Sequence, residues 1–390
     1  MGATPLRHRK FSQPIVHFSK GVNEYFVRSR KSEIMLEEIL SQYGLSAHSV
    51  EPFGTGLINR TWLVKSNGDN FILQKINTDV FTRPEYISEN IELVNAYLRT
   101  KHPDYFFVAP VRNKEGRTMT GNAEKGFYRV FPFVKNSRTH DVVRNPDQAF
   151  EASKQFGLFS QLLSGLPLQS LKTTLPGFHD LSMRYRQFEQ ACMDGNPARI
   201  RQVRTESDFL RQHVGIVSTF EKIRSSGRFK TRVAHHDTKI SNVLFDQHDK
   251  GICVIDLDTI MPGYFISDVG DMFRTYLSPV SEEEQNFSKI EIRDDYFKAI
   301  VDGYLSKMAG ELNHEELQHI VYAGVFMIYM QAIRFLADYM NDDRYYGAAY
   351  EEHNYNRAKN QITLLKRLQE KEKTFDDFIA ESFFVRSTKL

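Results

Sequence analysis

The stretch His235-His236-Asp237-Thr238-Lys239-Ile240-Ser241-Asn242 decides how this sequence is interpreted. A histidine, then Asp237, then Asn242 five residues later is the spacing of a kinase catalytic loop. Fourteen residues after Asn242, an apolar run ends in Asp256. The short motif alone also arises by chance, because Asp and Asn are common turn residues. The acidic residue at the end of a second expected strand favours the kinase interpretation.

These three side chains suit the chemistry of phosphoryl transfer. The reaction spreads negative charge over the oxygens of the transferred group, and a metal must neutralise that charge. Oxygen ligands suit Mg²⁺, so we expect Asn242 and Asp256 to bind it. Asp237 is then the catalytic base that accepts the proton of the attacking hydroxyl. A zinc hydrolase that uses His235 and His236 is less favoured. Adjacent residues at a strand end point to opposite faces, and no second His–carboxylate cluster follows to complete a zinc site.

A second motif, Phe53–Thr61, has the composition of a loop that covers phosphates. Glycine lets backbone N–H groups approach phosphate closely, and we expect Gly54, Gly56, Asn59 and Thr61 to bind the nucleotide. The motif is not a Walker loop, because no Gly-Lys-Ser/Thr follows. An ordinary hairpin turn is the alternative for the two glycines.

Around these motifs, strand patterns come first and helix patterns follow. Expected strands are 61–64, 71–76, 106–111 and 126–134, and later 243–245 and 252–257. Expected helices include 146–164, 181–193, 205–225, 266–277, 291–309, 313–340 and 353–371. We therefore predict an α+β, bilobal protein-kinase-like fold. Its parts are a poorly ordered basic extension (1–30), a nucleotide-binding N-terminal lobe (31–134) and a helical catalytic and substrate lobe (135–390).

Composition narrows the function further. The 390 residues include 51 basic and 49 acidic ones, so no basic stripe suggests a nucleic-acid partner. Two cysteines form neither a disulfide framework nor a zinc site. We find no run of about 18 apolar residues, so we expect no membrane span. A cytoplasmic location is expected by default, and composition does not give the oligomeric state.

The chain resembles the aminoglycoside phosphotransferase and choline kinase superfamily, and within it most closely the N-acetylhexosamine 1-kinases. The segments that carry this resemblance are TGLIN (55–59), ILQKIN (72–77), AHHDTK (234–239), VIDLDTIMPGYFISDVGD (254–271) and residues 352–354, 357–358 and 360–361. They span most of residues 50–370. The catalytic pair is specific to the superfamily, whereas the long tract from 254 to 271 is more specific to the sugar kinases.

The resemblance implies roles for residues at matching positions. Lys239 would reach the transferring phosphate or the sugar. Arg334 would contact the sugar, with Tyr345 or Tyr346 beside it. An ion pair with Asp338, four residues along the same helix, is the structural alternative for Arg334.

Other residues keep two interpretations each. His236 could touch substrate or be a buried structural histidine. Asp258 could bind a second metal or cap the turn that follows it. Asp268 would hold backbone N–H groups near the site or cap a helix. The backbone from Phe131 to Phe133 would hold the adenine.

One position departs from the kinase pattern. Kinases place a lysine on the third strand to hold the α- and β-phosphates, and here Gln74 takes that place. Lys75 follows but alternates to the other face. Either Gln74 bonds to the phosphates, or Lys75 reaches round a bulge. The carboxylate partner on the next helix would be Glu89 or Glu92.

Taken together, the residues and the resemblance predict an enzyme that uses ATP and Mg²⁺. It would phosphorylate the anomeric hydroxyl of N-acetylglucosamine or N-acetylgalactosamine, giving an α-sugar 1-phosphate and ADP. The alternatives are a kinase of the same fold for choline, homoserine or an aminoglycoside, and a non-catalytic nucleotide-binding protein. A protein kinase is disfavoured, because Asp-Phe-Gly and Ala-Pro-Glu are absent from the sequence.

Overall fold

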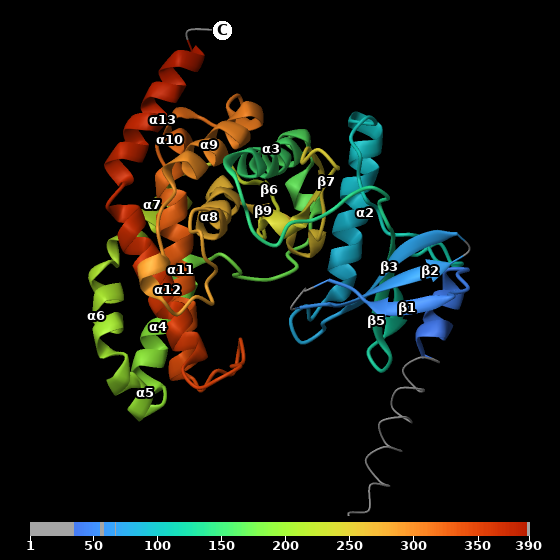
Figure 1. Cartoon of the computed structure of the whole chain (residues 1–390), viewed down its shortest axis with the longest axis horizontal. Coiled ribbons are helices and arrows are strands. Elements are labelled where there is room, and N and C mark those ends of the chain that lie inside the picture. The colour runs from blue at the N-terminus through green and yellow to red at the C-terminus, as the bar shows by residue number, and fades with distance from the viewer. Residues whose placement is uncertain (1–34, 55–57, 67, 388–390) are drawn as a thin grey trace, which may run out of the picture.

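The computed structural model describes residues 35–54, 58–66 and 68–387, with side chains up to residue 382. A small sheet lobe and a larger helical lobe face each other (Figure 1), which confirms the predicted bilobal fold. The predicted basic extension at 1–30 and Gly56 lie outside the described residues.

One antiparallel sheet forms the smaller lobe. Its strands, in spatial order, are β1 (Ser49–Pro52), β2 (Arg60–Ser66), β3 (Asp69–Ile76), β5 (Gly126–Pro132) and β4 (Thr120–Asn122). Strands β2 and β3, expected at 61–64 and 71–76, form an antiparallel hairpin. Gly68 has φ +86°, which is the left-handed conformation that this tight turn requires.

The strand expected at 106–111 is wrong, because this segment is irregular. It lies beside β5, and the Val111 N–H donates to the Val130 carbonyl at 2.7 Å. Pro110 carries no N–H, so the segment cannot continue the ladder.

Each face of the sheet lobe has its own apolar contacts. A helix over 35–42 packs on a cluster that contains Val64, Leu73 and Tyr128. Helix α2 (Pro84–Lys101) turns its predicted apolar face to the core shared with the helical lobe. Figure 1 shows α2 standing between the sheet and the central short strands.

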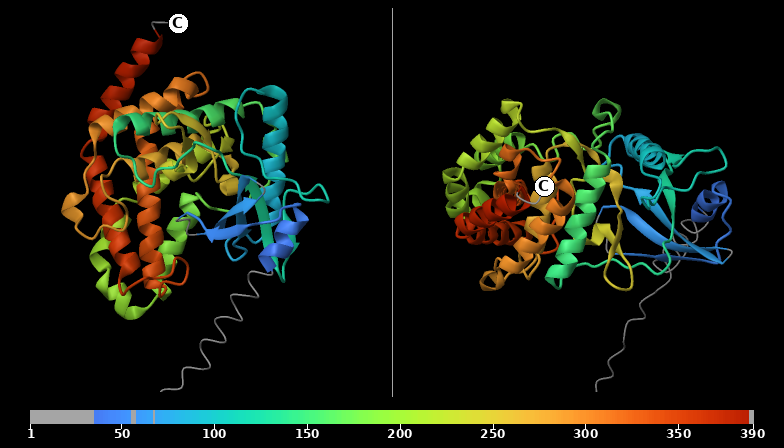
Figure 2. Two further views of the ribbon diagram at one scale, coloured as in Figure 1. Left: turned by 45° about the vertical axis from the view of Figure 1, so that its right-hand side comes forward. Right: turned by 90° about the horizontal axis from the view of Figure 1, so that it is seen from above.

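The second lobe is built mainly of helices around four short strands. The helices are α3 (Pro146–Leu162), α4 (Leu181–Asp194), α5 (Pro197–Gln202), α6 (Arg204–Gln212), α7 (Gly215–Ser226), α8 (Phe265–Tyr276), α9 (Asp294–Met308), α10 (His314–Leu317), α11 (Ile320–Met340), α12 (His353–Gln369) and α13 (Glu372–Ser387). The strands are β6 (Arg232–Ala234), β7 (Val243–Phe245), β8 (Gly251–Val254) and β9 (Met261–Gly263). Seen from above in Figure 2, the green α3 and the yellow strands lie between the sheet and the orange and red helices.

Two expected helices are each divided in the structure. The helix expected at 205–225 is interrupted at 213–214, between α6 and α7, and that expected at 313–340 separates into α10 and α11. At the start of α10, Asn313 and Glu316 form a capping box. Hydrophobic periodicity continues across such short breaks and therefore does not reveal them.

Helix α11 is the centre of the helical lobe. Among the described residues it is the one helix long and apolar enough to cross a membrane, with a mean hydropathy of 1.6. The expectation that no such stretch exists is therefore wrong. However, 89% of its apolar window is buried inside the protein, as expected for a core helix.

Asn90 on α2 fastens the two lobes together. Its Nδ2 donates to the carbonyls of Lys172 (2.8 Å) and Ile260 (2.9 Å), and its Oδ1 accepts from the Lys172 N–H (2.8 Å). The Asn90 side chain is fully buried, so water competes little for its bond to Ile260, which is also buried.

We predict that Asn90→Leu lowers the free energy of unfolding by about 2–4 kcal/mol, because it removes three hydrogen bonds and leaves the buried Ile260 carbonyl without its partner. Urea denaturation followed by circular dichroism measures the change. Glu89→Gln, at an exposed position of the same helix, is the matched control and should change stability by less than about 0.5 kcal/mol. Equal stability of the two variants would contradict this interpretation.

Candidate active site

The 235–242 segment forms a loop between β6 and β7, next to the strand pair β7–β8. Antiparallel pairing of Val243 with Val254 brings the chain back beside the loop. The Ile255 N–H donates to the Asn242 carbonyl at 2.9 Å. Asp256 follows directly, so the hairpin brings the two predicted metal ligands to one place.

Carboxylates of α8 fix the backbone of this loop. Asp268 accepts from the N–H groups of His235 (3.1 Å) and His236 (2.8 Å), and Asp271 accepts from the Thr238 N–H (2.8 Å). The Tyr276 hydroxyl donates to the Thr238 carbonyl at 2.6 Å. Of the two interpretations of Asp268, the structure selects the one in which it holds backbone N–H groups.

Asp237 lies between two of the other predicted residues. Asn242 Nδ2 donates to Asp237 Oδ2 at 2.9 Å, and Lys239 Nζ lies 3.2 Å from Asp237 Oδ1. The pKa of Lys239 is raised, first by Asp237. The lysine therefore keeps its positive charge where a transferred phosphoryl group would carry negative charge.

The carboxyl of Asp256, like that of Asp268, has a raised pKa. Surrounding protein raises its pKa to about 7, with further contributions from Asp258 and Asp237, while Arg129 and Lys239 act in the opposite direction. The side chain nevertheless keeps contact with solvent. A concentration of negative charge that remains accessible suits a divalent cation.

The donor set fits Mg²⁺ bound jointly with nucleotide phosphates. Asn242 and Asp256 offer an amide oxygen and a carboxylate, and Mg²⁺ commonly takes one or two carboxylates together with phosphate oxygens. Within the described part of the chain, no group of three or more His, Cys, Asp or Glu side chains could hold a metal. The site is therefore no all-protein metal cage.

Asp258 does not cap the turn that follows it, and its binding of a second metal stays a prediction. Its Oδ1 forms an ion pair with Arg129 Nη2 at 2.5 Å, and its Oδ2 accepts from Asn59 Nδ2 at 2.7 Å. Asn59 Oδ1 also accepts from the Asn77 N–H at 3.0 Å. Asp258 is thus a link from the helical lobe to the end of the glycine-containing loop.

Gln74 points toward the helical lobe, and Lys75 points away from it. Strand β3 pairs with β2 and β5 without a bulge. Lys75 Nζ lies 5.6 Å from the centre of the Tyr128 ring, on the face that packs against the 35–42 helix. The suggestion that Lys75 reaches round a bulge is therefore wrong. Gln74 instead bonds to Arg129 and Thr61.

Gly54, Phe131 and Phe133 are the remaining residues that the sequence predicts to bind the nucleotide. Gly54 has φ +77° and open space where a Cβ would stand. The Phe133 N–H donates to the Asn70 carbonyl at 3.0 Å, so that N–H is already used and is not free for adenine. The Phe133 ring lies 6.2 Å from the Phe53 ring, edge to face. Phe131 pairs with Ile72 in the sheet.

Arg334 and Tyr345 lie close together in the helical lobe. The guanidinium carbon of Arg334 lies 5.5 Å from the ring centre of Phe178, 5.9 Å from that of Tyr345 and 5.4 Å from that of Tyr346. The alternative ion pair with Asp338 is wrong. Asp338 accepts instead from the N–H groups of Tyr345 (2.8 Å) and Tyr346 (2.9 Å).

His236 connects this aromatic group to the catalytic loop. Its Nδ1 lies 3.3 Å from Nδ1 of His179, whose ring stacks on Phe178 at 4.3 Å. Burial lowers the pKa of His236 to about 4, so the ring is neutral at pH 7. Sequence reasoning missed Phe178 and His179, because an aromatic pair before a helix carries no motif.

Sequence comparison places this site in a known family. Residues 49–305, more than half of the chain, match the phosphotransferase enzyme family APH. The chain belongs to this family. It is a small-molecule kinase, and as an APH kinase it uses ATP with a divalent metal, typically Mg²⁺.

Solved structures of low sequence identity share the fold. An aminoglycoside phosphotransferase from Alicyclobacillus acidocaldarius has 12% identity and a TM-score of 0.60, with 88% of this chain and 95% of that chain covered. A microcompartment-associated aminopropanol kinase has 16% identity and a TM-score of 0.60, covering 88% and 98%. Choline kinase LicA from Streptococcus pneumoniae has 15% identity and a TM-score of 0.52, covering 85% and 98%.

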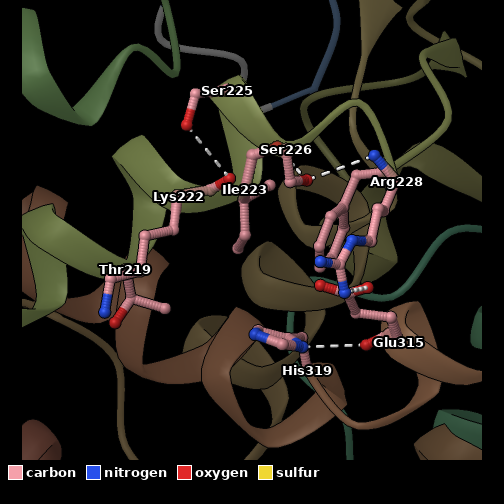
Figure 3. A pocket seen from close by; sticks show the side chains of 9 residues that line it. Thr219, Lys222, Ile223, Ser225, Ser226, Arg228, Glu315 and His319 are labelled. Atoms are coloured by element: carbon pink, nitrogen blue, oxygen red, sulfur yellow. Dashed lines mark hydrogen bonds and ion pairs between the residues drawn. The ribbon is translucent and has the colours of Figure 1, made fainter.

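Two surface hollows lie away from the APH catalytic loop. One, of about 370 Å³, is lined by residues of α7 and α10 and of the segments that follow them, including Lys222, Arg228 and Glu315 (Figure 3). The other, of about 250 Å³, is lined in part by Thr219, Tyr322 and Glu372. Neither shares a residue with the site described above.

Burial of the His236 ring should make the stability of the folded protein depend on pH. Its pKa of about 4 in the folded protein lies below the unfolded value near 6.5. The unfolded chain therefore binds the proton first, and stability is lost as pH falls below about 6.5. His236→Asn, which suits the residue's positive φ of 65°, should reduce the loss of unfolding free energy between pH 7.5 and 5 by about 2 kcal/mol.

Urea denaturation at the two pH values measures this difference. His248→Asn, at an exposed position, controls for the loss of a histidine and should keep the pH dependence of the wild-type protein. An unchanged pH dependence in His236→Asn would show that burial of this ring is not what links stability to protons.

Proposed function

We propose that the protein is an ATP-dependent kinase of the anomeric hydroxyl of N-acetylhexosamines. The products would be an α-sugar 1-phosphate and ADP. The observation that carries the proposal is the group of Phe178, Tyr345 and Tyr346 around Arg334, joined to the catalytic loop by His179. Aromatic faces suit the C–H faces of a sugar ring, and guanidinium N–H groups donate to hydroxyl or acetamide oxygens.

The charge of this region argues against cationic acceptors. Burial and the neighbouring Arg334 lower the pKa of Arg184 to about 10. Arg184 hydrogen-bonds to Gln187 and to the Phe178 carbonyl, and its Nε is buried without a partner. Two guanidinium groups beside the aromatic rings would repel choline or a polycationic aminoglycoside. A neutral sugar pays no such electrostatic penalty.

In this proposal each residue of the loop has one task. Asp237 accepts the proton of the anomeric hydroxyl, and Lys239 lies beside the group being transferred. Asn242 and Asp256 would hold Mg²⁺, which when bound neutralises phosphate charge. Asp268 and Asp271 keep the loop in place through its N–H groups. Catalysis then comes mainly from positioning and charge.

We also propose a cytoplasmic location. Cys192 and Cys253 are both free thiols in the structure, which suits a reducing compartment. The sugar and ATP are the proposed binding partners.

ADP release with Mg²⁺ tests the acceptor class. We expect turnover of N-acetylglucosamine and N-acetylgalactosamine, and none of choline, homoserine or an aminoglycoside. Asp237→Asn should lower kcat by about 10²- to 10⁴-fold, because it removes the general base. Turnover of choline or homoserine without any sugar would replace this proposal by the corresponding rival. Undiminished turnover by Asp237→Asn would refute the mechanism.

Arg334 offers a second test, on the acceptor side. Arg334→Met should raise KM for the sugar by about 10- to 100-fold, because it removes a charge-assisted donor, with KM for ATP unchanged. Arg344→Met is the control, since the Arg344 side chain is 81% exposed. Equal KM values for the sugar in the two variants would exclude Arg334 from the acceptor site.

A further inference from the structure

Three side chains form a row across the sheet at the position where kinases carry their phosphate-binding lysine. Thr61 on β2, Gln74 on β3 and Arg129 on β5 are cross-strand neighbours in register. Gln74 Oε1 accepts from Arg129 Nε (3.0 Å) and Nη2 (2.8 Å), and Gln74 Nε2 donates to Thr61 Oγ1 (3.3 Å). Gln74 thus orients a neighbouring cation, although it carries no charge itself.

The guanidinium of Arg129 is buried, and one of its three nitrogens has no hydrogen-bond partner. Arg129 is 2% exposed, and its ion-pair partner Asp258 is 3% exposed. The Phe131 ring lies 5.0 Å from the guanidinium carbon. Nη1 is buried and has no hydrogen-bond partner. A buried donor without a partner is rare, because leaving it unsatisfied is costly, and it points to a ligand that completes the bonding.

The lysine and glutamate of the kinase pattern have no counterparts at their usual places. Lys75 lies on the far face of β3. Of the two glutamates expected to serve as partners, Glu92 accepts from Thr118 and Arg112, and Glu89 is exposed. A basic group beside an acidic one is nevertheless present, as Arg129 and Asp258.

We propose that Arg129 is the phosphate-binding cation of this kinase, with Nη1 donating to oxygens of the α- and β-phosphates of ATP. Asp258 takes the place of the helix carboxylate that orients the lysine in other kinases. The proposal rests on the ATP-dependent activity but not on the identity of the acceptor. The sequence alone did not predict this role for Arg129, because kinases usually carry the cation on the third strand, whereas Arg129 lies on β5.

Asp258 also connects this cation to the rest of the nucleotide site. Its second oxygen accepts from Asn59, which in turn accepts from the Asn77 N–H. Asp256, two residues away, is a predicted metal ligand. Asp258 therefore connects Arg129 to the end of the glycine-containing loop. It also lies in the same segment as Asp256, the predicted metal ligand.

Calorimetric titration with adenosine, ADP and ATP, each with Mg²⁺ and without acceptor, tests the proposal. Arg129→Met should weaken ADP and ATP binding by about 10- to 100-fold and leave adenosine affinity within about twofold of the wild-type value. Arg129→Lys, which keeps the charge but loses the fork, should recover part of the lost affinity. Lys75→Met is the matched control and should bind all three ligands as the wild-type protein does.

The outcomes separate this proposal from its rivals. Equal weakening of adenosine and ATP would make Arg129 a structural residue only, and unchanged ATP affinity in Arg129→Met would exclude it from phosphate binding. A loss of ATP affinity in Lys75→Met would assign the role to Lys75. If Arg129→Met does not fold, the ratio of ATP to adenosine affinity in Arg129→Lys decides. Phosphate-dependent binding without sugar turnover would refute the acceptor class and leave this proposal standing.

Discussion

The site depends on the bonds from two buried carboxylates of α8 to the backbone of the catalytic loop. Asp268 and Asp271 accept from three backbone N–H groups of that loop, at residues 235, 236 and 238. His236 has a positive φ of 65°, a conformation that non-glycine residues adopt at a cost of about 1 kcal/mol or more and that surrounding contacts must maintain. Helix α8 packs against the core helix α11. The bonds from Asp268 and Asp271 therefore fix the loop that carries Asp237 relative to the helical core.

Charge is divided between two ends of the site. Asp237, Asp256 and Asp258 concentrate negative charge near the expected metal, and Lys239 and Arg129 offset it. Arg334 and Arg184 lie in the acceptor site proposed above, among aromatic rings and near a neutral His236. Under the proposed function, this separation gives cation binding to one end of the site and disfavours cationic acceptors at the other.

Local patterns predicted the fold and the catalytic loop well, because each depends on residues close in sequence. The strands β2 and β3 and the 235–242 motif are of this kind. The prediction failed where distant segments meet. Asp258 faces Arg129, which lies 129 positions earlier, and nothing in either local sequence announces the pair. Phe178 and His179 come close to His236 only through tertiary packing. The prediction of a strand at 106–111 was wrong, because this segment lies beside β5 without forming a hydrogen-bonded ladder.

The way Asp338 holds the 341–347 turn bears on how new specificities could arise. Its carboxylate bonds to the main chain of Tyr345 and Tyr346, so the shape of the turn is independent of the side chain at 345. Tyr345 is also 64% exposed and supports little of the core. Many residues can therefore replace Tyr345 without unfolding the lobe. Under the proposed function, this makes the turn a natural starting point for evolving kinases with altered acceptors.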